Sequence, residues 1–261
     1  MLMLSLLIGT LPGLALVFTP QAVKAIQTQT QPTPVIRTIK FSGYDWNVKS
    51  SDLMGPGPNR WNPANVWVDG KGWLHLKITQ KDGKWECAEV ASLQRFGFGT
   101  YEFEIAGPSR IDQFDINTVL GLFNYPTPDV GGDGTNEIDV EFAHWGMEKA
   151  PPGNFTVWPP VKEAHNNTHP FSFALKSNSS THSFTWTTTG VVFASTNGSG
   201  RNAAKGAPLQ EWSYTPENSA ERIPQHPMPV LMNLWLFRGH APTDGKDVEI
   251  VVQRFRFTAL K

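Results

Sequence analysis

The chain has 261 residues, with 22 basic and 23 acidic side chains and a formal net charge of −1. This even balance gives no electrostatic case for binding nucleic acid or an anionic membrane surface. Ten tryptophans are many for this length, and exposed aromatic rings often hold sugars because each ring buries a large apolar area.

Residues 1–25 are apolar and end in small residues at Val23 and Ala25, which predicts a secretory signal peptide cleaved after Ala25. No Lys or Arg precedes the apolar run, which departs from the usual signal. Pro12 and the short apolar length argue against a stable membrane span. Residues 26–36 are polar and contain Pro, as in a linker. We therefore expect a secreted, monomeric protein with one domain at 37–261 and no membrane partner in its mature form.

Beyond residue 36 there is almost no helical periodicity. Short runs alternate polar and apolar residues and end at clusters of Gly, Pro, Asn or Asp. Many short strands without interleaved helices predict an all-β fold, built as an antiparallel sandwich or barrel. The clearest runs are VWVDG (66–70), WLHLKITQKDG (73–83), GTYEFEIAGP (99–108), HSFTWTTTGVVFAS (182–195), MPVLMNLWLF (228–237) and VEIVVQRFRF (248–257).

The segment NEIDVEF (136–142) alternates without interruption. In a strand its apolar residues enter the core, while Glu137, Asp139 and Glu141 share the opposite face. A solvated outer face would explain the carboxylates, but like charges roughly 6.6 Å apart repel, and acidic residues are poor strand formers. Calcium binding is a second interpretation, because carboxylate oxygens suit that ion.

Catalysis is the third interpretation of these carboxylates. Glu137 and Glu141 are about 13 Å apart at Cα in a straight strand, and their side chains can lean together. A separation of about 5–5.5 Å between carboxyl groups is that of a retaining glycosidase. Asp139 between them can hydrogen-bond one neighbour and raise the pKa of the other.

Five segments together resemble glycoside hydrolase family 16. They are CAEVASLQRFGFGTYEFEI (87–105), LGLFNYP (120–126), EIDVE (137–141), HSFTW (182–186) and MNLW (232–235). The resemblance covers most of residues 41 to 258. It implies a concanavalin-like β-jelly-roll sandwich of two antiparallel sheets with a concave substrate cleft, and activity mainly on β-linked glucans and galactans.

The resemblance also implies catalytic roles. Glu137 is expected to be the nucleophile, Glu141 the general acid and then base, and Asp139 the residue that tunes both. No metal or organic cofactor takes part in the family's chemistry. Some members bind a structural calcium away from the cleft, which the sequence does not decide. We interpret the loop DVGGDG (129–134) as a flexible tip rather than a calcium site.

The resemblance suggests further cleft positions, each with a structural alternative. Glu89 could instead be an exposed strand charge, Phe123 and Trp235 could be core, and Asn59 and Trp61 could belong to a structural loop around a buried Trp. The substrate-binding candidates are Glu89, Phe123, Tyr125, Asn233, Trp235, Trp158, Trp61 and Asn59.

Two positions depart from the family pattern. Ala91 stands where the family often has Arg, so a sugar contact is lost or supplied elsewhere. Cys87 is the only cysteine, so it cannot form the intramolecular disulfide of lichenases, and we expect a buried apolar residue.

The predicted function is retaining endo-β-glycanase activity on β-1,3-1,4- or β-1,3-glucan by double displacement. Two alternatives stay open. A transglycosylase would pass the same covalent intermediate to a sugar, and a non-catalytic jelly roll would only bind glycan.

Overall fold

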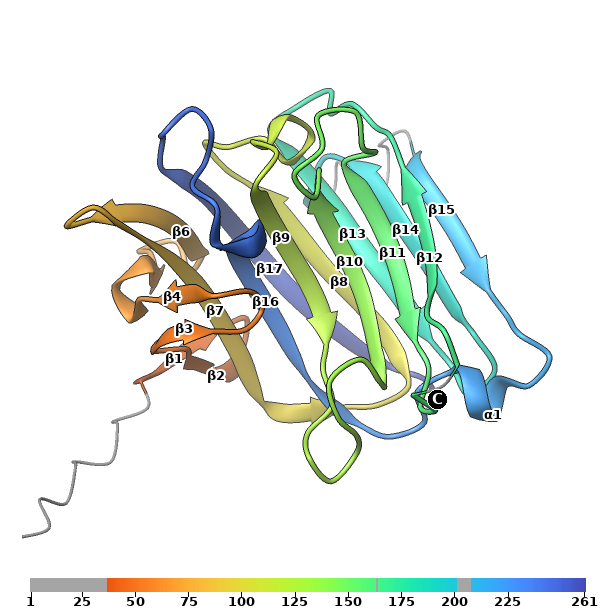
Figure 1. Cartoon of the computed structure of the whole chain (residues 1–261). Coiled ribbons are helices and arrows are strands. Elements are labelled where there is room, and N and C mark those ends of the chain that lie inside the picture. Colours follow the sequence, from red (N-terminus) through yellow and green to blue (C-terminus); the bar gives the residue numbers. More distant parts are fainter. Residues whose placement is uncertain (1–36, 163, 201–207) are drawn as a thin grey trace, which may run out of the picture. The chain divides into compact units, whose positions relative to one another are not determined.

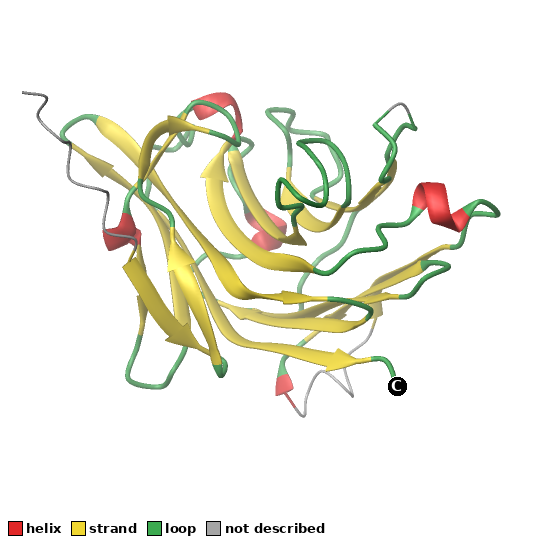
Figure 2. Ribbon diagram, turned by 90° about the horizontal axis from the view of Figure 1, so that it is seen from below, coloured by secondary structure: helices red, strands yellow, loops and turns green. Residues whose placement is uncertain are grey.

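The computed structural model describes residues 37–162, 164–200 and 208–261, so the predicted signal peptide and linker lie outside the described residues. Two layers of antiparallel strands lie one above the other (Figure 2). Within the described residues no helix is long and apolar enough to cross a membrane.

The first sheet carries the acidic strand β10 near its centre (Figure 1). In spatial order its strands are β1 (Arg37–Phe41), β2 (Tyr44–Val48), β7 (Lys84–Phe96), β16 (Met228–Leu236), β9 (Thr118–Asn124), β10 (Glu137–Ala143), β11 (Gly153–Trp158) and β12 (Asn167–Phe171).

The second sheet faces the first one. Its strands, again in spatial order, are β5 (Val66–Val68), β6 (Leu74–Lys81), β17 (Val248–Ala259), β8 (Gly99–Ala106), β13 (Ser179–Trp186), β14 (Val191–Asn197) and β15 (Pro208–Tyr214).

The long strand β7 links the two sheets, because its first residues pair with β6 and its later residues pair with β2 and β16. A small hairpin of β3 (Ser51–Met54) and β4 (Asn59–Trp61) lies against the start of β7. The helical pieces are short: η1 (Pro63–Asn65), η2 (Ile111–Gln113), α1 (Ser219–Arg222) and η4 (Phe237–Gly239).

The predicted strands are confirmed, including the long apolar strand as β16 and the last run as β17. The Asp82–Gly83 stop is a tight turn between β6 and β7, and both residues have positive φ. Gly190 lies in the turn between β13 and β14, where its carbonyl accepts a hydrogen bond from Thr187 N–H at 2.9 Å.

The core fills the space between the sheets. The alternation predicted for β10 is confirmed, since Ile138, Val140 and Phe142 are fully buried. Phe155 of β11 stacks on Phe193 of β14 with ring centroids 4.8 Å apart, which joins one sheet to the other. Because the inner face of β10 is held in this way, its outer face has a fixed position.

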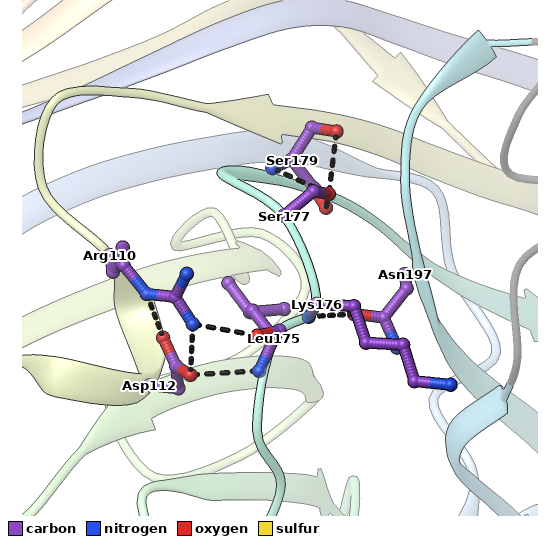
Figure 3. Close-up of polar contacts among 7 residues, drawn as sticks. All are labelled: Arg110, Asp112, Leu175, Lys176, Ser177, Ser179 and Asn197. Carbon is purple, nitrogen blue, oxygen red and sulfur yellow. Dashed lines mark hydrogen bonds and ion pairs between the residues drawn. The ribbon is translucent and has the colours of Figure 1, made fainter.

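The connection from β12 to β13 passes from one sheet to the other and is tied at several points (Figure 3). Asp112 Oδ2 accepts hydrogen bonds from Leu175 N–H and from Arg110 Nη2, both at 2.8 Å. Arg110 Nη2 also donates to the Leu175 carbonyl at 2.7 Å, and Lys176 N–H donates to Asn197 Oδ1 at 2.8 Å. These hydrogen bonds hold the β12–β13 connection in place where it passes between the two sheets.

Candidate active site

The three carboxylates of β10 lie on the outer face of the first sheet, as the alternation predicts. Glu137 and Glu141 line a cleft of about 780 Å³, and Asp139 lies between them with only 3% of its surface exposed. The cleft lining also includes Lys49, Glu89, Asp133 and Trp158.

Two donors from β11 hold the carboxylates. Trp158 Nε1 donates to Asp139 Oδ2 at 2.9 Å, and Asn154 Nδ2 donates to Glu141 Oε2 at 3.1 Å. Both donors come from the strand next to β10, where Asn154 is the direct partner of Glu141 in the register. The pairing of β10 with β11 therefore places the donors that orient Asp139 and Glu141.

Burial raises the pKa of every member of the trio. It raises the pKa of Glu137 to about 8, although a hydrogen bond from Asp139 opposes the rise and the charges of Glu141 and Asp133 add to it. Burial and the charge of Glu137 hold the pKa of Asp139 well above its usual range. Burial, then the charge of Asp139, does the same to the pKa of Glu141, against the Asn154 hydrogen bond.

In all three acids these shifts favour the protonated form, and one contact within the trio opposes them. The raised pKa of Asp139 favours its protonated form, and the hydrogen bond between Asp139 and Glu137 lowers the pKa of Glu137 against the effect of burial. The raised pKa of Glu141 also favours its protonated form, and no hydrogen bond from within the trio opposes it. Carboxyl groups that lie close together but have different hydrogen-bond partners are the kind of arrangement that can divide the roles of acid and nucleophile.

A row of five residues, one of them Glu141, crosses five neighbouring strands (Figure 1 shows the strands side by side). Asn154, Glu141, Gly121, Asn233 and Glu89 are successive partners on β11, β10, β9, β16 and β7. Three residues of this row, Glu141, Asn233 and Glu89, line the cleft, which therefore extends across the strands from β10 to β7.

The far end of this row is a polar network. Asn233 Oδ1 accepts a hydrogen bond from Gly121 N–H at 3.1 Å, and Asn233 Nδ2 donates to Glu89 Oε2 at 3.2 Å. Lys49 Nζ lies 2.8 Å from Glu89 Oε1 and donates to the Gly55 carbonyl at 2.7 Å. Burial raises the pKa of Glu89, and Lys49 and Asn233 oppose that rise.

Lys49 is a cleft residue that the sequence analysis missed. The chain has Ala91 where the resemblance led us to expect Arg, and a lysine from the end of β2 supplies a positive charge beside Glu89 instead. The sequence does not reveal the pairing of Lys49 with Glu89, because the two residues are forty positions apart. Only the pairing of β2 with β7, with Lys49 N–H donating to the Glu89 carbonyl at 3.0 Å, brings them together.

The predicted aromatic residues mostly line the cleft. Phe123, Tyr125, Trp158 and Trp235 belong to its lining, together with Asn233 and Glu89. Phe123 and Tyr125 meet edge to face with centroids 6.2 Å apart, and Tyr125 OH donates to Asp133 Oδ1 at 2.9 Å. The structure therefore brings six of the eight predicted binding positions to one cleft.

Asn59 and Trp61 are outside the residues that line the cleft, which agrees with the structural alternative for these two positions. Each is 3% exposed. Asn59 Nδ2 donates to the Pro56 and Leu236 carbonyls at 2.7 and 2.9 Å, and Trp61 Nε1 donates to the Met54 carbonyl at 2.8 Å. Both residues use their polar atoms to hold the 54–57 loop, whose own residues form the cleft edge.

Cys87 lies beneath the same loop, as expected of a buried cysteine. Its thiol is fully buried and donates to Asn59 Oδ1 at 3.4 Å. Burial raises the pKa of the thiol to about 12, so it is protonated and unreactive at neutral pH.

The 129–134 loop is anchored at one end. Arg95 donates to both carboxylate oxygens of Asp129, at 2.6 and 2.9 Å, and Asp133 reaches the cleft at the other end. Among the described residues no group of three or more His, Cys, Asp or Glu side chains is placed to hold a metal ion.

Comparisons with known proteins bear on this arrangement. No family model matches the chain. A β-glucanase of Bacillus licheniformis is 26% identical over 178 residues, which is 67% of this chain and 62% of the relative. The match thus spans about three fifths of that relative's length.

Solved structures share the fold. A glycoside hydrolase family 16 endo-glucanase from Bacteroides ovatus superposes with a TM-score of 0.61 at 16% identity, over 82% of this chain and 94% of that one. A pseudo β-1,3-glucanase and immunostimulatory antigen of Mycobacterium tuberculosis superposes with a TM-score of 0.60 at 20% identity, over 83% and 91%. The chain therefore has the lichenase-like fold of glycoside hydrolase family 16.

Proposed function

We propose that the protein is a retaining endo-β-glucanase acting on β-1,3-1,4- or β-1,3-glucan. The observation that carries this proposal is the pair Glu137 and Glu141 lining one cleft, with the buried Asp139 between them. The similarity to a β-glucanase supports a glucan as substrate, and the export predicted from residues 1–25 suits a polymer outside the cell.

The proposed first step forms a covalent intermediate. The Glu137 carboxylate attacks the anomeric carbon, while Glu141 gives its proton to the glycosidic oxygen of the departing chain. Asp139 donates its hydrogen bond to Glu137 before attack, when Glu137 carries a full charge. That bond lowers the pKa of Glu137 and so partly offsets the effect of burial on the nucleophile.

The second step reverses the proton flow. Glu141, now ionised, takes a proton from water as the water attacks the anomeric carbon, and the bond to Glu137 breaks. Asn154 donates to Glu141 and favours its ionised form in this half of the cycle. The anomeric configuration is inverted twice and so retained.

The rest of the cleft is proposed to bind the chain. Glu89, Asn233 and Lys49 offer acceptors and donors to sugar hydroxyls, and Trp235 offers an aromatic face. The 54–57 loop contributes to the cleft lining next to Lys49. Subsites of this kind bind an internal stretch of polymer, which is the requirement of an endo-acting enzyme.

A rescue experiment separates the two glutamates. Glu137→Ala and Glu141→Ala are assayed on an aryl β-glucan oligosaccharide, which has an activated leaving group, with and without sodium azide. Azide occupies the space of the missing carboxylate. We expect an α-glycosyl azide from Glu137→Ala, by one displacement, and a β-glycosyl azide from Glu141→Ala, by two.

Wild-type assays test the activity itself. Barley β-glucan, laminarin and xyloglucan are each followed by reducing-end release and by product linkage. Chain-length exchange without new reducing ends would make the protein a transglycosylase. Binding with no turnover of any of these polymers would contradict catalysis and favour the glycan-binding alternative.

A further inference from the structure

We propose that Trp145 is a positioning residue that holds the indole of Trp235 in the cleft as a platform for a sugar ring. This inference rests on the proposed function. Trp145 itself is absent from the cleft lining and lies four residues after Glu141, in the turn that follows β10.

The backbone at Trp145 is unusual for its residue type. Trp145 and Gly146 have φ of 53° and 76°, and Met147 N–H donates to the His144 carbonyl at 2.9 Å. Two successive residues with positive φ form the centre of a type I′ turn, where Asn-Gly and Asp-Gly are preferred.

Other turns of the chain follow that preference. Ser42–Gly43 and Asp82–Gly83 have the same pattern of φ, at 52° and 84° and at 49° and 74°, and each begins with a small polar residue. A bulky side chain in the left-handed region is strained. Such strain persists where the surroundings impose it, and it is concentrated at functional sites.

The Trp145 ring contacts two aromatic residues, and one of them, Trp235, lines the cleft. Its ring meets Trp235 at 6.3 Å between centroids with a 60° interplanar angle, and Phe237 at 5.7 Å and 78°. Gly146 N–H donates to the Ile116 carbonyl at 2.8 Å, and a Cβ on Gly146 would come within 3.3 Å of Phe237. The turn therefore packs on Phe237, two residues after Trp235, as well as on Trp235 itself.

This contact limits the freedom of a ring that must face a ligand. Trp235 is 8% exposed, so only part of its indole reaches the cleft. Stacking on a sugar requires one ring orientation, and a ring already held in that orientation loses less entropy when the ligand binds. Trp145 therefore acts on the affinity for glycans that reach Trp235, and the chemical step at Glu137 does not depend on it.

A double-mutant cycle tests this inference. Trp145→Asn and Trp145→Gly remove the ring and suit the turn. Each is made with and without Trp235→Ala in the Glu137→Gln form, and binding of a β-1,3-1,4-gluco-tetrasaccharide is measured by calorimetry. We expect about 3- to 10-fold weaker binding when Trp235 is present, and about equal binding when it is absent. Asp82→Asn, in a matching turn, is the control.

A second measurement needs no ligand. With nitrogen-15-labelled tryptophan, the indole resonance of Trp235 is assigned from its loss in Trp235→Ala. We expect this resonance to shift and broaden in both Trp145 variants and to stay in place in Asp82→Asn.

An unmoved resonance, or equal weakening of binding in both backgrounds, would overturn the role of Trp145. Failure of the wild type to hydrolyse any glucan would instead overturn the proposed function. The indole measurement would still report on the contact in that case, so the two failures are distinguishable.

Discussion

Gly121 and Asn233 face each other on β9 and β16, and the Asn233 side chain fills the space that a Cβ at residue 121 would need. That Cβ would lie 2.5 Å from Asn233 Oδ1. The absence of a side chain on Gly121 is therefore a condition for the network that joins Asn233 to Glu89.

Gly121→Ala should displace the Asn233 amide and weaken its bond to Glu89. We expect KM to rise about tenfold and the free energy of unfolding to fall by about 1–3 kcal/mol. Steady-state kinetics and chemical denaturation measure the two effects. Gly70→Ala is the control, because a Cβ there meets nothing within 4 Å. Unchanged kinetics in Gly121→Ala would contradict a binding role for Asn233.

Lys49→Met should leave the buried Glu89 carboxylate without its cation. The pKa of Glu89 is raised chiefly by burial and lowered by Lys49, so the variant should bind a proton at Glu89 at higher pH than the wild type does. We expect KM to rise about tenfold, which corresponds to a loss of roughly 1.4 kcal/mol in binding free energy, with a smaller change in kcat.

Lys49→Arg keeps the charge and should recover most of the affinity. Lys71→Met removes a cation that lies over Trp73, outside the cleft, and should have no effect on kinetics. Equal KM values for Lys49→Met and wild type would show that Glu89 does not need this partner to bind substrate.

Asp133→Asn should move the pH dependence of kcat/KM. Burial is the main cause of the raised pKa of Glu137, and the negative charges of Glu141 and Asp133 add to it. Removing one of these charges lowers the pKa of Glu137, so the acidic limb of the profile should move to lower pH. In the wild type this limb is expected above pH 4.5, toward 8. Asp82→Asn, on the exposed β6–β7 turn, should leave the limb in place.

Glu137→Gln should stabilise the fold while abolishing turnover. The folded-state pKa of Glu137 is raised from 4.5 to about 8, so the folded chain binds its proton more tightly than the unfolded chain. The stability from this proton is complete below pH 4.5 and is lost as pH rises through 8.

The stability difference between Glu137→Gln and wild type should therefore grow between pH 4.5 and 8, to about 2–5 kcal/mol. Urea denaturation at pH 4, 6 and 8 measures it. Glu211→Gln, on an exposed position of β15, is the matched control. A difference that does not change with pH would mean that burial of the Glu137 charge has no cost.

The sequence predicted what depends on local periodicity. Alternation in 136–142 correctly divides β10 into a buried face and an acidic face, and the same pattern identifies β6, β8 and β17. In these segments each residue's side is set by its neighbours two positions away.

Partners from other strands could not be predicted in this way. Asn154 and Lys49 reach Glu141 and Glu89 only through the pairing of β10 with β11 and of β2 with β7. The positions of Asn59 and Trp61 could not be predicted for a related reason. A loop rich in Gly and Pro does not reveal from its sequence which residues face the cleft and which hold the loop from below.

The row from Asn154 to Glu89 takes one residue from each of five strands. Neighbouring strands are about 4.8 Å apart, so the row is about 19 Å long. A substitution at one position of this row changes the side chain there and leaves the backbone spacing of the strands unchanged. Selectivity for a different linkage could therefore be built strand by strand, while the acids on β10 stay fixed.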